Sequence, residues 1–588
     1  MTGSPRPGHR PIRRLAPETV ERIAAGEVVE RPASAVKELV ENAVDAGATS
    51  VTVRLTGGGL DRIEVADDGV GIPADELELA VERHATSKLA PEGPVEEVAF
   101  LGFRGEALAA IAAVSRFHLL SRTAEAEVAE GIEVAGSRPV GRTTEPRAPG
   151  TTVEVEELFF NTPARRKFLR SPAREQLEVV RVLEQQYLAR PSVALRLLAE
   201  GTEILSLPAT RALADAAGRV LGEGFPGRSI PVRAKADGVT IDGLVGAPAL
   251  AAATSTYLYL SVNARPVVAR SLSQAVRGGF GDTVPRNRFP VGVLHLTVEP
   301  SRLDVNVHPT KREVRLADAR QVEEAVRHAV AGAIAAAPPV GEAPAPFGRP
   351  VGDRAPPPLP LRGPPVEPSP SPGGRQRTLP TGADAAPHLE LPAAGARPRL
   401  ELLGPVDALY WVASSDDGLV LVDQHAASER LLYDTLRAGG AIARQTLVQP
   451  VPLTLTASER ATLAAHAEEV RGAGFEVEPF GPGAFRVLAV PSYRGRSVRA
   501  DAVVELLREL AAGGRPTLPD GLEERRAASI ACHAAIRAGD VVERSRIAEV
   551  LAALDRLPDR PRSCPHGRPI YVHLPRSRLD RWFLRSGA

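Results

Sequence analysis

The sequence predicts a multidomain protein of mixed α/β and α+β class, and three observations support this prediction. The chain has 588 residues, well beyond the length at which one hydrophobic core usually divides into domains. A stretch rich in proline, alanine and glycine interrupts it from residue 335 to residue 398. On both sides of this stretch, alternating strand patterns occur together with helical apolar stripes.

Four segments follow from this organisation. The stretch at 335–398 contains few large apolar residues, and its many prolines lack an N–H donor, so it cannot build a core and is predicted to be a flexible linker. Before it we place an α+β domain at 1–204 and a second αβ unit at 205–334. After it we place one further αβ domain at 399–588.

Composition limits the classes of function. Lys+Arg and Asp+Glu both total 72, so net charge gives no signal for nucleic acid, although a local basic patch stays possible. The sequence has no apolar run of membrane-spanning length and no secretory signal, which predicts a cytoplasmic protein without a membrane partner. Its 2 cysteines exclude a disulfide scaffold.

In the first domain, one helix and three strands can be placed in order. Pro32 is suited to a first helical turn, and residues 35–46 carry helical spacing. The apolar stripe of this helix comprises Val36, Leu39, Val40, Ala43 and Val44. Strands are predicted around 51–55, at 63–65 and at 151–158, where apolar residues alternate.

The later parts of the chain give weaker but similar signals. Strands are predicted at 257–263 and 291–298 in the second unit. After the linker, an apolar run at 418–422 predicts a strand, and a helix that begins here would put His425 and Glu429 on one face.

The predicted first helix carries a polar stripe opposite its apolar one. Glu38, Glu41, Asn42 and Asp45 share this face. A stripe of this kind, taken alone, is typical of a solvated surface. The strand at 63–65 then leads into Asp67-Asp-Gly-Val-Gly71, where glycines allow close approach of a ligand and a carboxylate can accept from an amine. A plain turn explains that motif equally well.

Two further motifs suit anion binding. One is Thr86-Ser87-Lys88, and the other places Gly102 to Gly105 immediately before a predicted helix start. Backbone amides and the positive end of the helix dipole would favour phosphate there. The sequence contains neither a P-loop nor a dinucleotide-binding glycine motif after a strand.

Together, these motifs resemble the four-motif ATP site of the GHKL superfamily. The longer stretches IAAGEVVERPASAVKELVENAVDAGA, RHATSK, GFRGEAL, GTTVEVEELFFNTPARRKFL and VNVHPTKREVRL are similar to the MutL family of DNA mismatch-repair proteins. The resemblance covers most of residues 15–330. It implies an ATPase domain at 1–204 with a sandwich fold and a transducer domain at 205–334 that completes the ATP site.

The resemblance implies a role for individual residues, with ATP and Mg²⁺ as cofactors. Glu38 matches the general base that activates water, Asn42 the Mg²⁺ ligand, and Lys311 the lysine that reaches in from the transducer. Asp67 matches the residue that recognises adenine. The other implied nucleotide-binding residues are Asp45, Gly69, Gly71, Thr86, Ser87, Lys88, Gly102, Phe103, Arg104, Gly105, and Thr151 or Thr152. Asn263-Ala-Arg265 stands where the family usually has Asn-Gly-Arg, a change expected to alter a turn but not the chemistry.

Three motifs after the linker combine carboxylate, imidazole and thiol groups. They are Asp423-Gln-His425 with Glu429, Cys532-His, and Cys564-Pro-His566. Such side chains are ligands for zinc or manganese. Each fragment alone is weak, since a lone cysteine is usually a small buried hydrophobe and no Cys-x-x-Cys spacing is present.

These fragments resemble the endonuclease-bearing members of the family. The resemblance implies a Mn²⁺ and/or Zn²⁺ site that nicks DNA through metal-activated water, with Asp423 and Glu429 also catalytic. The implied metal ligands are Asp423, His425, Glu429, Cys532, Cys564 and His566. Asp434 stands where the motif usually ends in Glu, so its role is in doubt.

Residues Gln445–Pro450 resemble the short sliding-clamp-binding motif of the same domain, with a buried strand as the alternative. The preferred hypothesis is an ATP-gated mismatch-repair endonuclease that forms a homodimer through its C-terminal domain. Its implied partners are DNA, a mismatch-sensing MutS-type protein and the sliding clamp. Two alternatives stay open: a matchmaker whose C-terminal domain only dimerises, and another GHKL ATPase such as a topoisomerase subunit, a chaperone or a sensor kinase.

Overall fold

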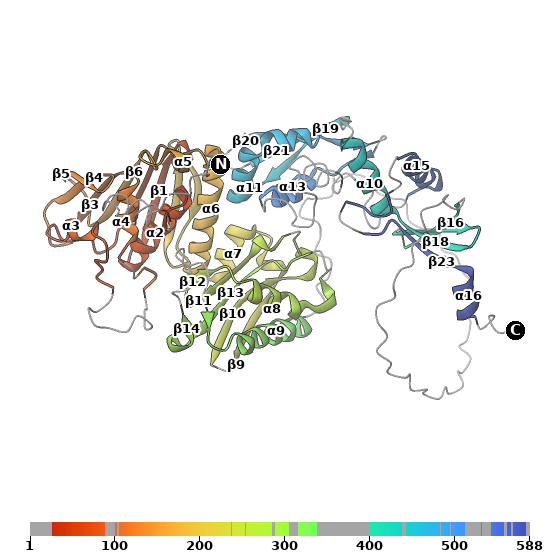
Figure 1. The fold of residues 1–588 in the computed structure, drawn as a ribbon, viewed down its shortest axis with the longest axis horizontal. Helices are drawn as coiled ribbons and strands as arrows, with labels where there is room; N and C mark the ends of the chain where they lie inside the picture. The colour runs from red at the N-terminus through yellow and green to blue at the C-terminus, as the bar shows by residue number, and fades with distance from the viewer. Residues whose placement is uncertain are drawn as a thin grey trace, which may run out of the picture. The chain divides into compact units, whose positions relative to one another are not determined.

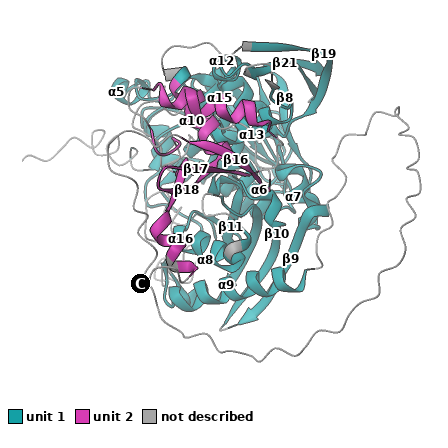
Figure 2. Ribbon diagram, turned by 90° about the vertical axis from the view of Figure 1, so that its right-hand side faces the viewer, with its two compact units in different colours: residues 1–340, 435–534 teal, residues 341–434, 535–588 magenta. Residues whose placement is uncertain are grey.

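The computed structural model describes residues 26, 28–88, 100–102, 105–236, 238–252, 254–284, 288–304, 315–337, 400–407, 409–437, 443–481, 484–493, 496–511, 531, 535, 542–557, 561–565 and 568–583. The linker prediction beyond residue 337 therefore lies outside the described residues. The chain divides into two compact units, Met1–Val340 with Thr435–Ala534, and Gly341–Asp434 with Ala535–Ala588 (Figure 2).

The first domain is built on an eight-stranded sheet in the order β5-β4-β3-β6-β2-β1-β7-β8 (Figure 1). Neighbouring strands are antiparallel, except that β1 and β7 run parallel. The strands are β1 (Ser50–Thr56), β2 (Arg62–Asp67), β3 (Arg116–Arg122), β4 (Ala129–Ala135), β5 (Arg138–Glu145), β6 (Gly150–Glu156), β7 (Ala194–Ala199) and β8 (Thr202–Leu207). The three predicted strands are thus confirmed as β1, β2 and β6.

Helix α2 (Pro32–Asp45) confirms the predicted first helix and begins at the proline itself. Proline suits this position because the first N–H groups of a helix have no intrahelical partner. Val36, Leu39 and Val40 are buried in one cluster with the sheet and with α6 (Pro172–Ala189). The other helices of this domain are α3 (Leu77–Ala80), α4 (Ala107–Ala113) and α5 (Pro163–Arg166), and α7 (Leu213–Leu221), which follows residue 204, contributes to the same buried cluster.

The second domain has a five-stranded sheet in the order β12-β11-β13-β10-β9. Its strands are β9 (Ser229–Ala236), β10 (Val239–Gly246), β11 (Leu258–Val262), β12 (Arg265–Val267) and β13 (Gly292–Val298), and β14 (Leu303–Asp304) pairs separately with β15 (Arg315–Leu316). Helices α8 (Arg270–Phe280) and α9 (Ala319–Ala336) share a buried cluster with the five-stranded sheet. The predicted strands at 257–263 and 291–298 are confirmed as β11 and β13.

The turn between β11 and β12 shows the effect of the alanine that replaces glycine. Asn263 and Ala264 adopt φ values of 50° and 60°. Asparagine tolerates this left-handed region, whereas alanine does so at a cost. The side chain of Asn263 also ties the turn to Val298, accepting from its N–H at 2.9 Å and donating to its carbonyl at 3.0 Å. The turn keeps its form, and Ala264 bears the strain.

The part of the first unit that follows the linker has a sheet in the order β19-β21-β20, with β22 paired to β21. These strands are β19 (Ala443–Thr454), β20 (Glu476–Gly481), β21 (Ala484–Tyr493) and β22 (Arg496–Ser497). The helices are α11 (Ala457–Ala465), α12 (Ala467–Gly472) and α13 (Ala502–Ala511). Thr456 and Glu459 form a capping box that begins α11. Ala457 and Ala461 of α11 belong to the same buried cluster as α6.

The second unit contains a four-stranded sheet in the order β16-β17-β18-β23. The strands are β16 (Glu401–Val406), β17 (Tyr410–Ser415), β18 (Gly418–Asp423) and β23 (Tyr571–Pro575), and the helices are α10 (Gln424–Arg437), α15 (Arg544–Asp555) and α16 (Arg576–Trp582). Strand β18 and helix α10 confirm the strand and helix predicted there. Within the described part of the chain, no helix is both long and apolar enough to cross a membrane.

Candidate nucleotide site and candidate metal centre

The polar face of α2 is buried, so the interpretation as a solvated surface is wrong in this structure. Glu38 and Glu41 are 6% and 1% exposed. Lys37 lies between them, with its Nζ 3.0 Å from Oε1 of Glu38 and 2.9 Å from Oε1 of Glu41. Burial acts to lower the pKa of Lys37, but Glu38 and Glu41 outweigh it and raise that pKa. Gln186 of α6 also donates to Oε1 of Glu41, at 2.9 Å.

Lys88 brings the third predicted motif onto the same face of α2. Its Nζ donates to Oδ1 of Asn42 at 2.8 Å and to Oδ2 of Asp45 at 2.7 Å. Thr86 accepts from the N–H of Lys88 through Oγ1, at 3.2 Å. The amide oxygen of Asn42 therefore faces a cation. Hard oxygen ligands of this kind suit Mg²⁺, so the donor set fits the implied metal.

Asp45 holds the segment at Gly102 against α2. Its carboxylate accepts from the N–H groups of Leu101 and Gly102, both at 2.9 Å. A Cβ atom at Gly102 would lie 3.0 Å from Nζ of Lys88 and 3.2 Å from Oδ1 of Asn42. A larger residue here would therefore displace Lys88 and Asn42 from their present positions by a few tenths of an ångström. Gly105 precedes α4, whereas Phe103 and Arg104 lie outside the described residues.

Asp67 lies at the end of β2 and is partly buried. Its Oδ1 accepts from the N–H groups of Gly69 at 2.9 Å and Thr151 at 3.2 Å. Burial raises the pKa of Asp67, and these hydrogen bonds and Arg147 oppose it only in part. Of the two predicted threonines, Thr151 contacts this carboxylate, and Thr152 accepts from Nε of Arg147 at 2.9 Å.

Gly71 sits where no other residue fits. Its φ is +78°, and a Cβ atom built there would lie 2.2 Å from the carbonyl oxygen of Arg122. The motif Asp67-Asp-Gly-Val-Gly71 therefore requires its second glycine for both conformation and space. The structure brings this motif and the α2 motif together at one side of the sheet, because β2 pairs with β1 and Val70 N–H donates to the carbonyl of Ala46 just after α2.

Two polar residues around this site were not predicted. Arg147 donates through Nη2 to the carbonyl of Asp67, at 2.8 Å, from a loop without a sequence signal. Lys37 could have been found, because its i,i+4 spacing to Glu41 places the two side chains on one face. Lys311, which the resemblance placed at the nucleotide, lies outside the described residues, while Ser87 is described but exposed.

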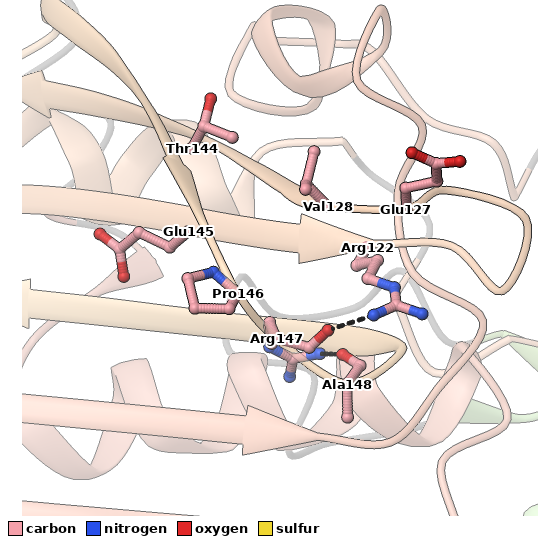
Figure 3. Close-up of a pocket in the computed structure, with 8 residues that line it drawn as sticks. All are labelled: Arg122, Glu127, Val128, Thr144, Glu145, Pro146, Arg147 and Ala148. Carbon is pink, nitrogen blue, oxygen red and sulfur yellow. Dashed lines mark hydrogen bonds between the residues drawn. The ribbon is translucent and has the colours of Figure 1, made fainter.

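A cavity of about 600 Å³ lies beside Arg147 (Figure 3). Arg122 donates to the carbonyl of Arg147 at 2.7 Å, and Nη1 of Arg147 donates to the carbonyl of Ala148 at 2.8 Å. The lining residues are Arg122, Glu127, Val128, Thr144, Glu145, Pro146, Arg147 and Ala148. None of the predicted site residues lines this cavity. Arg147 lines it and also donates to the carbonyl of Asp67 in the candidate nucleotide site.

In the second unit, the structure brings two of the three C-terminal motifs to one edge of a sheet. Strand β18 ends at Asp423, and β23, which follows the Cys564 motif, pairs with it antiparallel. The N–H of Asp423 donates to the carbonyl of Ile570 at 3.0 Å. Cys564 is buried and its N–H donates to the carbonyl of Arg568 at 2.9 Å. The end of β18 therefore lies beside the start of β23, which follows the Cys564 motif in the chain.

The remaining side chains of this candidate centre are only partly described. Asp423 begins α10 by accepting from the N–H of Ala426 at 2.9 Å, and Glu429 on the same helix is buried. His425 is partly exposed. Cys532 and His566 lie outside the described residues, and among those described there is no group of three metal-binding side chains. Asp434 forms an i,i+4 ion pair with Arg430 at 2.8 Å.

The segment Gln445–Pro450 is not buried, so the buried-strand alternative is wrong. It lies within β19, and the pairing register with β21 shifts between Thr446 and Val451. Gln445 and Pro450 are exposed, and the side chain of Val448 is fully exposed.

Comparison with known proteins gives the class first. Residues 30–138, which contain α2 and the Asp67 and Lys88 motifs, match the family model of histidine kinase-, DNA gyrase B- and HSP90-like ATPases. The first domain is therefore a GHKL-type ATPase domain.

The particular family follows from the rest of the chain. Residues 217–335 match the family model of the DNA mismatch repair protein C-terminal domain, and residues 403–542 match the MutL C-terminal dimerisation domain. The DNA mismatch repair protein MutL of Desulforudis audaxviator is 39% identical, with 98% of this chain and 100% of that protein covered. That of Paramagnetospirillum magneticum is 41% identical, with the same coverage. The chain belongs to the MutL family.

Similar solved structures cover about half of the chain. The N-terminal domain of a DNA repair protein has 25% identity and a TM-score of 0.47, and covers 54% of this chain and 98% of its own. The Aquifex aeolicus MutL ATPase domain complexed with ADP has 30% identity and a TM-score of 0.36, and covers 46% and 94%.

Proposed function

We propose that this protein couples ATP hydrolysis to DNA mismatch repair and acts as a homodimer through its C-terminal domain. The observation that carries the proposal is the buried face of α2, where Glu38 lies one turn from Asn42 and the amide oxygen of Asn42 faces a cation. Family membership supports the repair role, and the match to a dimerisation domain supports the homodimer. A mismatch-sensing MutS-type protein would provide the signal to which hydrolysis responds.

Each side chain has a role in this proposal. Glu38 is the general base, held in place by the Lys37 ammonium 3.0 Å away. Asp67 accepts from the exocyclic amine of adenine, and the amides at Gly69 and Gly71 shape the pocket around it. Lys88 and the segment from Gly102 to Gly105 surround the phosphates, and Lys311 completes the charge. Mg²⁺ bound to Asn42 would neutralise charge on the β- and γ-phosphates.

We also propose that the part of the chain after the linker, residues 399–588, nicks DNA. Asp423, His425, Glu429 and Cys564, with Cys532 and His566, would hold Mn²⁺ and/or Zn²⁺, and the metal would activate water against the phosphodiester. The pairing of β18 with β23 supports this proposal, because it places Asp423 beside Ile570, which closely follows the Cys564 motif in the chain. The exposure of Gln445–Pro450 supports contact with a sliding clamp.

Two activity measurements test the proposal. Glu38→Ala is expected to abolish ATP turnover, with the exposed Glu82→Ala as a matched control. Wild-type protein with Mn²⁺ is expected to nick supercoiled DNA, and Asp423→Asn to lose nicking while the exposed Asp416→Asn keeps it. Normal turnover in Glu38→Ala would show that the base is another group. If Asp423→Asn nicks like wild type, the nuclease assignment fails and the matchmaker alternative stands.

A further inference from the structure

Arg265 connects the second domain to the ATP site of the first. It is the first residue of β12, directly after the Asn263–Ala264 turn, and is 5% exposed. Its Nη2 donates to the carbonyl of Phe100 at 3.0 Å, across 165 positions of the chain. Phe100 immediately precedes Leu101 and Gly102, whose N–H groups bind Asp45. The short segment 100–102 is therefore held from both domains, by a guanidinium on its carbonyl and a carboxylate on its amides.

The charges around Arg265 also point to the ATP site. Burial lowers the pKa of Arg265, while attraction to Glu41, Asp45 and Glu38, in that order, raises it. All three carboxylates belong to α2, and their side chains are 2%, 2% and 8% exposed. An arginine stays charged in such a place, so it contributes a full positive charge to them.

A count of charges shows why that contribution matters. The side chains of Lys37 and Lys88, 11% and 18% exposed, pair with the same carboxylates from within the first domain. Arg265 adds a third cation beside these three carboxylates, and Arg190 is a further cation near Arg265. Buried carboxylates without compensating cations are strongly disfavoured. Of these three cations, Arg265 alone comes from the second domain.

One of the two terminal nitrogens of the Arg265 guanidinium does not donate a hydrogen bond to any described residue. Its Nη1 is buried and has no hydrogen-bond partner among the described residues. A buried donor of this kind is costly unless it serves a purpose. If this residue served only to pack the two domains together, an apolar side chain would do so without burying an unpaired donor.

We propose that Arg265 is a positioning residue for ATP hydrolysis. Its hydrogen bond to the Phe100 carbonyl fixes the position of residues 100–102, whose N–H groups bind Asp45. Its guanidinium also places a positive charge from the second domain near the carboxylates of α2, among them Glu38. Separation of the two domains removes both effects at once, so the position of the second domain controls whether the ATP site is assembled. The inference rests on the proposed function of α2 in hydrolysis.

The test is steady-state ATP hydrolysis by the full chain. Arg265→Gln, which keeps polarity but removes charge, is expected to lower kcat by roughly 10- to 100-fold, a size typical of mispositioned catalytic groups. Arg265→Lys is expected to fall between Arg265→Gln and wild type, because it restores the charge without the planar fork. Added guanidinium is expected to recover part of the activity of Arg265→Ala. Arg270→Gln, an exposed arginine of the same domain, is the matched control and should keep wild-type kcat.

The outcomes separate this inference from the function on which it rests. If wild-type protein hydrolyses ATP and Arg265→Gln turns over equally fast, the inference is overturned and the proposed function stands. A loss that neither Arg265→Lys nor guanidinium recovers overturns it as well, because it indicates a purely structural role. If wild-type protein does not hydrolyse ATP, the proposed function itself fails. Thermal unfolding of each variant identifies any that fails to fold. If Arg265→Gln does not fold, the ATP turnover of Arg265→Lys tests the inference instead.

Discussion

Nζ of Lys88 lies 2.8 Å from Oδ1 of Asn42 and ties the Thr86-Ser87-Lys88 motif to the helix that carries the proposed base. The same ammonium pairs with Asp45 at 2.7 Å. One lysine therefore connects the Thr86-Ser87-Lys88 motif to two residues on one face of α2. Its position bears directly on the binding of a phosphate group or a metal ion at Asn42.

Lys88→Met is expected to weaken ATP binding by about tenfold or more, because hydrogen bonds from a charged group contribute about 1.5–3 kcal/mol. The Asp45 carboxylate also loses a partner, so a small fall in unfolding temperature is expected. Equilibrium titration with a non-hydrolysable ATP analogue measures the affinity. Lys235→Met, which removes an exposed lysine of β9, is the matched control. Unchanged affinity in Lys88→Met would contradict the assignment of this lysine to the phosphates.

Ala264→Gly is expected to stabilise the protein by about 1 kcal/mol, because the φ of +60° at this position strains an L-residue and not glycine. Urea unfolding measures the gain, and ATP turnover should not change. Ala124→Gly, at an exposed turn position without a positive φ, is the control and should not stabilise. A loss of stability in Ala264→Gly would mean that the turn adopts a different conformation.

Gly71→Ala is expected to abolish nucleotide binding and to lower the unfolding temperature. The added Cβ would lie 2.2 Å from the carbonyl of Arg122, which is backbone and cannot move aside cheaply. Gly141→Ala is the matched control, since a Cβ there meets nothing within 4 Å. Thermal unfolding with and without ADP reports both effects. If ADP raised the unfolding temperature of Gly71→Ala as much as that of wild type, the assignment of this motif to nucleotide binding would be wrong.

Glu184 on α6 is expected to make stability depend on pH. Burial raises its pKa from 4.5 to about 8, and Arg181, Tyr259, Glu459 and the N–H of Ser458 affect it less. A carboxyl group whose folded pKa is raised stabilises the folded state most below the unfolded pKa. That contribution is lost as pH rises from 4.5 to about 8.

Glu184→Gln should therefore remove this loss and raise stability at pH 8 relative to wild type, by an amount on the order of a few kcal/mol. Urea unfolding at several pH values measures it. The exposed Glu203→Gln should follow the wild-type pH profile. Parallel profiles for wild type and Glu184→Gln would show that Glu184 is not protonated in the folded protein.

Local pattern was enough to predict α2 and six strands, although most of the helices and strands in the structure were not predicted. Pro32 marked the start of α2, and the alternation at Val51, Val53 and Leu55 marked β1, because both signals lie within a few residues of sequence. The loop that positions Arg147 had no such signal, since its hydrogen bond to the carbonyl of Asp67 joins positions far apart along the chain.

The sequence by itself determined the identity of the motifs, their order and the shared face of Glu38, Glu41 and Asn42, because a helix sets that face through its 3.6-residue period. Only the tertiary structure decided that Glu38 and Glu41 on this face are buried, that Lys88 bonds to Asn42, that Arg265 bonds to Phe100, and that β18 pairs with β23. Burial and charge balance depend on which distant segments pack together. The sequence pattern of this carboxylate stripe is typical of a solvated surface. In the folded protein its glutamates are buried and lie beside the side chain of Lys37, which lowers the cost of burying their charge.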